Sequence, residues 1–461
     1  MLLYSTTGGH FATGARVTLS IMPDGTNIGG TTSNLVSTLD NRFGSGAWQP
    51  AFLAASAWWE NYANINVAWV GDDGSAFGSG NYQQGDPNKG DIRIGGFAQA
   101  SNSMAFTILP PPANGASDSG DVFMNTNLTW SMGGGYDLET VAIHEIGHAL
   151  GLGHSADSYA SMYANYNGVK QSPSTDDIAG IRAVWGPRQE DGLAQGWSNF
   201  TFANAANINP FMNSSNQITL AYQSVAKSSE SYNFKVTTPA NSSSSLSIVV
   251  QSSSLSLLSP KVQLFDANTN GLIQTSAATN AYGAAIGMTY GSATPNTTYY
   301  IRVFGTNGGQ TGTGAYALLV NMGSAGMSLV NPPNTQVAVQ ASQGGGGLSQ
   351  ILGGDNGTTV IFPTFRTQAE FLMTPGSIDP KVYRVSSFKQ HGVAAPASPA
   401  TAAGDVTASP LTISTVTSIS AQDKGASANV PAPIRGQRPA GPGSASLRPA
   451  QALDDYSWLD D

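Results

Sequence analysis

Hydrophobic positions in the first 187 residues alternate between the period of a helix and that of a strand. Spacings of three and four residues predict one apolar face of an amphipathic helix, formed by Trp48, Phe52, Ala55, Trp59 and Tyr62. Apolar runs at 65–70, 91–97 and 104–109 predict strands that follow this helix. The mixture predicts a domain that contains both helices and strands.

Capping residues predict where two further helices begin and end. Asp137 is the expected N-cap of a helix over 138–150. Gly151 suits its C-terminal end, because glycine adopts the left-handed conformation without a Cβ penalty. Ser174 and Asp177 fit a capping box and predict a third helix that begins near residue 174.

The period changes to two between about residues 197 and 322. Apolar residues alternate with polar ones in short runs such as Tyr232, Phe234 and Val236, separated by clusters of Gly, Asn and Ser. This pattern predicts an all-β sandwich of antiparallel strands, joined to the first domain by a linker at 188–196. Residues 323–461 include GGGG at 344–347 and a Pro/Ala/Ser-rich stretch at 394–450, and we expect this tail to be largely disordered.

Composition excludes several classes of function. The formal net charge of −9 gives no basic surface, so we expect no nucleic-acid partner. The chain has no cysteine, which excludes disulfides, thiolate metal ligands and a cysteine nucleophile. No run of 18 apolar residues occurs, so we expect no membrane span. The first residues show no signal peptide, and either the protein stays inside the cell or its true start lies upstream of Met1.

Three of the five histidines lie within the eleven residues HEIGHALGLGH, at 144–154. On a helix, His144 and His148 project from one face and can both reach one metal ion. Glu145 lies about 100° further round the helix axis, near enough to contact a metal-bound water without being a ligand. A turn at Gly151 can bring His154 round as the third ligand. Three protein ligands with an open fourth position are typical of catalytic zinc.

Chance is the competing explanation of this motif. A lone HExxH occurs in many unrelated helices and is weak by itself. Here the longer pattern HExxHxxGxxH is complete and contains most of the chain's histidines. The flanking sequence also has the helix and the glycine stop that the motif requires, so we favour a metal site.

These residues resemble the zinc motif of the metzincin metalloproteases. The sequence Ser161-Met162-Tyr163 resembles their Met-turn. Within that clan the chain is most similar to the matrixins, and to their bacterial members, over roughly residues 12–187. Ser155 after the third histidine, Asp176-Asp177-Ile178 at the start of the last helix and Gly120-Asp121 upstream carry that likeness.

The resemblance implies an α+β catalytic domain over residues 1–187, with a twisted mixed sheet and three helices. It implies that His144, His148 and His154 bind one catalytic Zn²⁺ and that Glu145 is the general base. Gly151 and Met162 would support the site, with Met162 as its floor; an ordinary core methionine is nearly the same interpretation. Ala105 and Phe106 resemble the edge strand that pairs with an extended protein or peptide substrate. We expect a monomer.

Departures from the matrixin pattern bear on the other metals. Met104 and Phe123 stand where the resemblance would place histidines of a structural zinc, so we expect none. Asp91 and Asp121 match family calcium ligands, which would give a structural Ca²⁺ site. The alternative is that these two aspartates only cap turns. The cysteine switch of animal matrixins cannot operate in a chain without cysteine.

Residues 197–322 resemble the bacterial pre-peptidase C-terminal type of β-sandwich, which is often attached to secreted proteases. The likeness rests on segments such as Tyr299-Tyr300-Ile301-Arg302-Val303 and Gly314-Ala315-Tyr316. Adhesion, substrate docking and spacing are all open as roles for this domain.

Three functions remain in competition at this point. The first is a zinc endopeptidase that cleaves extended protein substrates. The second is a surface or matrix binding protein whose sandwich binds partners and whose zinc domain is ancillary, although none of the ligands or the base is missing. The third is an intracellular metal-dependent hydrolase of another class, which the Met-turn and the last helix disfavour. The family resemblance implies a secreted or cell-surface protein.

Overall fold

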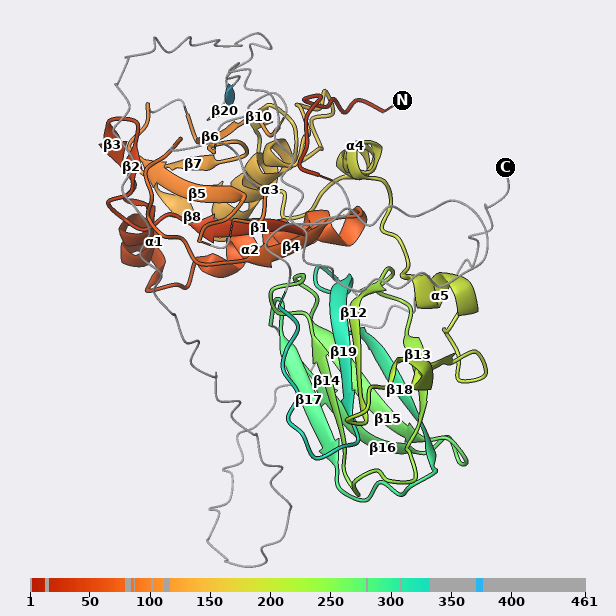
Figure 1. Ribbon diagram of the computed structural model, residues 1–461. Helices are drawn as coiled ribbons and strands as arrows, with labels where there is room; N and C mark the ends of the chain where they lie inside the picture. The colour runs from red at the N-terminus through yellow and green to blue at the C-terminus, as the bar shows by residue number, and fades with distance from the viewer. Residues whose placement is uncertain are drawn as a thin grey trace, which may run out of the picture. The chain divides into compact units, whose positions relative to one another are not determined.

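A mixed β-sheet forms the centre of the first 187 residues (Figure 1). Its parallel strands lie in the order β4-β1-β5-β7, and β6 pairs antiparallel with β7. The bounds are β1 (Arg16–Ile21), β4 (Asn66–Trp69), β5 (Ile92–Phe97), β6 (Ala105–Ile108) and β7 (Val122–Asn125). The strands predicted at 65–70, 91–97 and 104–109 are therefore present as β4, β5 and β6.

The structure is a computed structural model. It describes residues 2–12, 16–78, 84–86, 88–100, 103–111, 117–278, 281–306, 309–331 and 370–375. Four short strands make two small ribbons, β2 (Asn27–Ile28) with β3 (Thr31–Thr32) and β8 (Trp130–Ser131) with β9 (Tyr136–Asp137).

Helices complete this domain. They are α1 (Leu35–Phe43), α2 (Gln49–Tyr62), α3 (Leu138–Ala149) and α4 (Thr175–Trp185). The predicted apolar face of α2 is confirmed, since Phe52, Ala55 and Trp59 are all buried. The indole N–H of Trp59 donates to the carbonyl of Ile143 at 3.1 Å, which ties α2 to α3. The three helices expected from the sequence are thus α2, α3 and α4, and α1 is an additional one.

The predicted helix ends are also observed. The Asp137 carboxylate caps α3 by accepting from the Thr140 N–H at 2.9 Å. Ser174 and Asp177 form the expected capping box at the start of α4. Gly151 has φ of +104°, a conformation that L residues rarely adopt, so the chain can reverse directly after α3.

The later part of the chain forms two sheets with their own apolar core (green in Figure 1). One sheet has the order β11-β13-β18-β15-β16 and the other the order β12-β19-β14-β17. The bounds are β11 (Ala206–Asn207), β12 (Gln217–Val225), β13 (Tyr232–Thr237), β14 (Leu246–Gln251), β15 (Pro260–Asp266), β16 (Leu272–Ala277), β17 (Ala285–Tyr290), β18 (Thr298–Gly305) and β19 (Gly314–Asn321). A short helix, α5 (Gly192–Trp197), and a 3₁₀ turn (Asn209–Phe211) accompany them. The likeness to the pre-peptidase C-terminal type stays a prediction.

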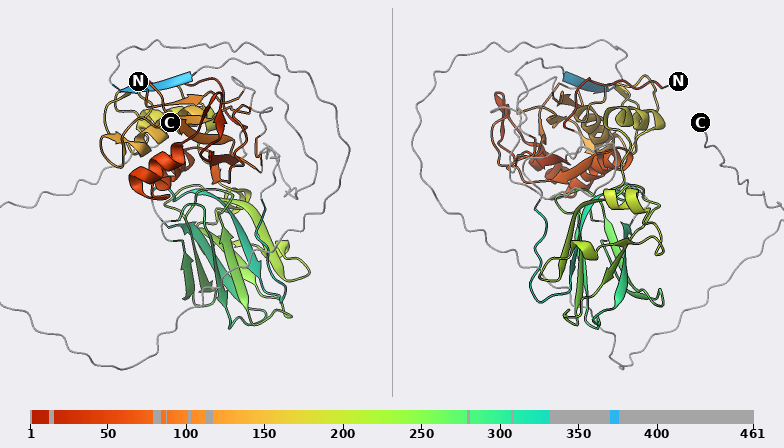
Figure 2. Two further views of the ribbon diagram at one scale, coloured as in Figure 1. Left: turned by 90° about the vertical axis from the view of Figure 1, so that its left-hand side faces the viewer. Right: turned by 45° about the vertical axis from the view of Figure 1, so that its right-hand side comes forward.

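The predicted disorder of residues 323–461 falls almost entirely outside the described residues. Two segments of this region are described, residues 323–331 and the strand β20 (Glu370–Pro375). It lies between β6 and the short strand β10 (Asn165–Tyr166), and the blue strand stays beside the same domain in both views of Figure 2. The sequence did not predict this strand.

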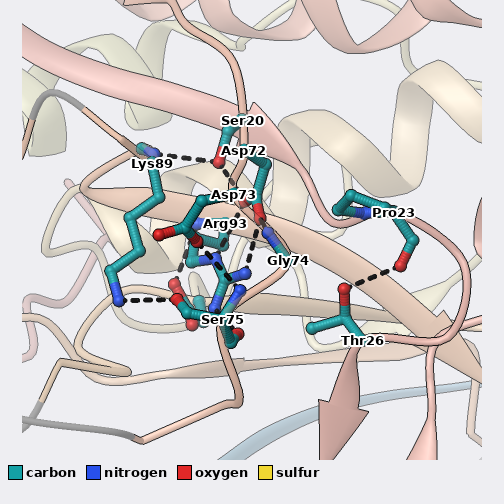
Figure 3. Close-up of polar contacts among 11 residues, drawn as sticks. Ser20, Pro23, Thr26, Asp72, Asp73, Gly74, Ser75, Lys89 and Arg93 are labelled. Carbon is teal, nitrogen blue, oxygen red and sulfur yellow. Dashed lines mark hydrogen bonds and ion pairs between the residues drawn. The ribbon is translucent and has the colours of Figure 1, made fainter.

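A buried ion pair ties the segment after β4 to β5 (Figure 3). The Arg93 guanidinium donates to both carboxylate oxygens of Asp72, at 2.6 and 2.8 Å, and to the Ser75 carbonyl at 2.9 Å. Asp72 also accepts from the Ser20 hydroxyl at 2.6 Å. Both charged side chains are almost fully buried, and Asp72 is the carboxylate that forms hydrogen bonds with the Arg93 guanidinium.

Among the described helices, none is both long and apolar enough to cross a membrane.

Candidate metal centre

Helix α3 and the turn after it bring the three histidines of the motif together. His144 and His148 are both buried on one face of α3, with ring centroids 4.5 Å apart. The reversal at Gly151 places the His154 ring 4.8 Å from His148 and 5.3 Å from His144. One ligand atom from each histidine lies within 4.8 Å of the others, and this is the one such group of metal-binding type among the described residues.

Backbone carbonyls orient the two helical imidazoles. His144 Nδ1 lies 2.7 Å from the Ser161 carbonyl oxygen, and His148 Nδ1 lies 2.7 Å from the Leu152 carbonyl oxygen. Because a carbonyl only accepts, each Nδ1 carries the proton and each Nε2 presents a lone pair. The two Nε2 atoms are 3.0 Å apart. Two lone pairs at this distance repel each other unless a cation lies between them. The donor set therefore fits zinc.

Burial also keeps the histidines in the form that binds metal. It lowers the pKa of His144 to about 3 and that of His154 to about 4, and the pKa of His148 falls well below its usual value. Mutual repulsion among the three rings acts in the same direction for His144 and His148. Neutral imidazoles are the ligands that zinc requires near pH 7.

Glu145 is buried beside the histidines, with its two carboxylate oxygens in different situations. Oε2 accepts from the Thr107 hydroxyl in β6 at 2.6 Å. Oε1 is buried and has no hydrogen-bond partner among the described residues. Burial raises the pKa of Glu145 to about 8, and the Thr107 hydroxyl partly opposes this. A bound cation would lower this pKa, which would favour the carboxylate that a general base needs.

Met162 lies beneath α3 and packs against Gly147, the one glycine of that helix. A Cβ placed on Gly147 would overlap the Met162 sulfur and approach Trp59 to 3.0 Å. The glycine of the HEIGH segment therefore admits the methionine to the underside of the site. Met162 is buried in the main core, so its position agrees with both interpretations given for it above.

Asp177 connects the cap of α4 to the turn that carries Met162. Its carboxylate accepts from the N–H groups of Ser161 at 2.7 Å, Met162 at 3.1 Å and Ser174 at 2.7 Å. The Ser161 carbonyl in turn orients His144. Asp177 thus positions His144 indirectly, because it holds the backbone of Ser161, whose carbonyl orients the imidazole.

The N-terminal residues pack against the loop that carries His154. The Gly153 N–H donates to the Ser5 carbonyl and the Thr7 N–H to the Gly151 carbonyl, both at 2.9 Å. The Leu3 N–H donates to the Asp176 carboxylate at 2.6 Å. These contacts extend the domain towards the N-terminus beyond residue 12, where the resemblance in sequence began.

The two aspartates expected as calcium ligands serve as acceptors for backbone groups. Asp91 accepts from the Thr18 N–H at 2.8 Å and from the Gly85 N–H at 2.6 Å. Asp121 accepts from the Arg93 N–H at 2.8 Å, and its Oδ2 has no hydrogen-bond partner among the described residues. Of the three donors, Thr18 lies in β1, Arg93 lies in β5 and Gly85 lies in a turn. Calcium binding and turn capping both stay predictions.

The positions compared with structural-zinc ligands lie in apolar surroundings. Phe123 is buried and packs against Phe77, Phe97 and Phe106. Met104 is buried in the main core. The lack of a second zinc stays a prediction.

Ala105 and Phe106, expected in the substrate strand, lie in β6 beside the base. Thr107 follows them in β6, and its hydroxyl reaches the carboxylate of Glu145. On the side away from β7, β6 pairs with β20. Thr107, Gly147 and Asp177 are the site residues whose roles the sequence did not reveal. For Gly147, the signal was a glycine between two histidines on a helix, where glycine is otherwise unfavourable.

Comparison with known proteins places this centre within a family. Residues 52–186 match the family model of the matrixins, so this part of the chain is a matrixin domain. The chain is similar to karilysin of Tannerella forsythia, with 35% identity over 127 residues, which cover 27% of this chain and 23% of karilysin.

Two animal proteins are also similar. Matrix metalloproteinase-20 of Homo sapiens is 44% identical over 81 residues, 17% of each chain. Interstitial collagenase of Equus caballus is 42% identical over 96 residues, 20% of this chain and 19% of the collagenase. The matched regions thus span a quarter or less of the length of these relatives.

Proposed function

We propose that residues 1–187 form a zinc-dependent endopeptidase that hydrolyses peptide bonds in extended protein substrates. One observation carries the proposal: three neutral imidazoles converge beside a buried carboxylate that has one uncommitted oxygen. The matrixin match and the metalloproteinase names of the relatives support the same chemistry.

The residues of the site have separate tasks in this proposal. A zinc ion held by His144, His148 and His154 would polarise the scissile carbonyl and make a water molecule more acidic. Glu145 Oε1 would accept a proton from the attacking water and later donate it to the leaving amine. The Thr107 hydroxyl holds Oε2, so that the carboxylate keeps one orientation throughout. Ala105 and Phe106 offer the backbone of β6 to an extended substrate.

Further parts of the proposal rest on the family likeness. We propose that the protein is secreted or exposed at the cell surface, that it acts as a monomer, that Asp91 and Asp121 contribute to a Ca²⁺ site, and that residues 197–322 are a sandwich of the pre-peptidase C-terminal type.

Metal analysis and a cleavage assay on the same preparations test the function. Wild type, Glu145→Ala and Glu145→Gln should each contain one zinc per chain by mass spectrometry. Cleavage of casein should fall by at least about a hundredfold in both variants, the usual scale for loss of a general base. If the chain contains no zinc, or if the variants cleave casein like wild type, the proposal is wrong. Undiminished cleavage would also reopen the binding-protein alternative.

A further inference from the structure

The strand β20 lies along the edge of β6, where the proposed function places the substrate. It runs antiparallel to β6, with Leu372 opposite Phe106 and Met373 opposite Ala105. At its C-terminal end it runs parallel to β10, with Thr374 opposite Asn165. One strand of this chain therefore lies between β6 and β10 in the sheet (Figure 1).

The spacing of strands explains why a single segment fits. Paired strands lie about 4.7–4.9 Å apart, so β10 and β6 stand about two such spacings from each other when one strand lies between them. Without β20, the outer side of β6 would be an open edge with unpaired N–H and C=O groups. Main-chain pairing of this kind accepts many sequences, because the hydrogen bonds come from the backbone.

The same strand passes the candidate base. Phe371 lies opposite Thr107 in the β6–β20 ladder. The Thr107 hydroxyl donates to Glu145 Oε2 at 2.6 Å. An extended substrate that pairs with β6 beside Glu145 would need the place that β20 holds, so the two cannot be bound together.

We propose that the segment 370–375 is a built-in competitive inhibitor, which pairs with β6 in the same chain and must leave before a protein substrate can bind. The proposal rests on the proposed peptidase function and adds a form of regulation to it. The segment lies in the region 323–461, whose composition by itself indicates only low complexity.

Proline substitution in the full-length chain provides the first test. Phe371→Pro with Leu372→Pro removes two adjacent N–H groups, one of which must face β6 whatever the register of hydrogen bonds. Ala402→Pro with Ala403→Pro is the matched control elsewhere in the tail. With an effective local concentration on the order of 1 mM and a segment Kd of about 0.1 mM, the KM for a fluorogenic peptide should fall about tenfold in the first variant, with kcat unchanged.

The control should keep the wild-type KM, and the wild-type KM should not depend on enzyme concentration. A KM that is equal in all three chains would overturn the proposal. A KM that falls on dilution of the enzyme would show that a second copy, not the same chain, supplies the strand.

A binding measurement separates this proposal from the peptidase proposal. A labelled peptide of residues 366–379 is titrated against Glu145→Ala chains and followed by fluorescence anisotropy. The chain that also carries both proline substitutions should bind the peptide about tenfold more tightly than the chain with its own segment intact. Equal binding by the two chains would overturn the inhibitor, even if both lack activity. If no chain cleaves substrate but the tenfold difference in peptide binding is still observed, only the peptidase proposal is refuted.

Discussion

Removal of the Asp177 carboxylate should weaken zinc binding from a residue that is not a ligand. In Asp177→Ala, the N–H groups of Ser161 and Met162 lose their acceptor, and α4 loses its capping box. Each buried donor left without a partner costs about 1–3 kcal/mol, and the damaged helix cap costs about 1 kcal/mol. For two such donors and one cap we expect a loss of about 3–7 kcal/mol in the free energy of unfolding. The Ser161 carbonyl orients His144, and loss of such support typically weakens metal affinity about 10–100-fold.

The chain offers a matched control for this substitution. Asp191 also accepts from three backbone N–H groups, those of Leu193 and Ala194 at 2.9 Å and that of Ser224 at 3.0 Å. Asp191→Ala should therefore destabilise the chain while leaving zinc affinity unchanged. Urea denaturation gives the stability, and competition with a chromophoric chelator gives the zinc Kd. A folded Asp177→Ala chain with the zinc Kd of wild type would contradict this prediction, as would an equal rise of the Kd in Asp177→Ala and Asp191→Ala. Asp177→Asn keeps one acceptor oxygen, so its zinc Kd should lie between those of wild type and Asp177→Ala.

Three further predictions concern stability. Asp72→Asn should lower the free energy of unfolding by about 3–5 kcal/mol, measured by urea denaturation, because it leaves Arg93 buried without its hydrogen-bonded carboxylate. The double variant that also carries Arg93→Met should recover most of this loss. Equal stabilities for the single and double variants would contradict the pairing. Burial raises the pKa of Glu60 from 4.5 to about 7, so the folded state holds this proton more tightly. The contribution of Glu60 to the free energy of unfolding should therefore fall by about 3 kcal/mol as the pH rises from 4.5 to 7. Glu60→Gln should remove this contribution from the measured pH dependence, and a pH dependence equal to that of wild type would refute the assignment. Gly147→Ala should lower the free energy of unfolding by about 1–3 kcal/mol, because the added Cβ overpacks against Met162. Gly134→Ala should leave the stability unchanged, because a Cβ there meets no neighbour within 4 Å. Thermal unfolding of both variants tests this, and equal melting temperatures would contradict it.

Local chemistry explains what could be predicted from the sequence. The apolar face of α2, the Asp137 cap and the positive φ of Gly151 each depend on a few neighbouring residues. The spacing of His144 and His148 is likewise a property of one helix. Such features are encoded within about one or two helical turns, so the pattern of residues is enough to find them.

Contacts between distant parts of the chain could not be predicted in the same way. Thr107 precedes Glu145 by 38 positions, and nothing in β6 marks that threonine as the partner of a base. Asp177 was identified as a cap, but its contacts with the Met162 turn depend on how α4 packs. The strand β20 lies in a region of weak periodicity, and its pairing partner β6 is more than 250 positions away. Such pairing depends on topology, which local patterns do not contain.

Zinc K-edge X-ray absorption on the full-length chain tests the central claim most directly. An open catalytic centre requires three protein ligands, so the spectrum should show three imidazole nitrogens at about 2.0–2.1 Å and one further light atom from solvent. Loss of one imidazole in His154→Ala should accompany loss of cleavage. A closed shell of four protein ligands, a sulfur ligand, or fewer than three imidazoles in the wild type would contradict the centre described for this chain.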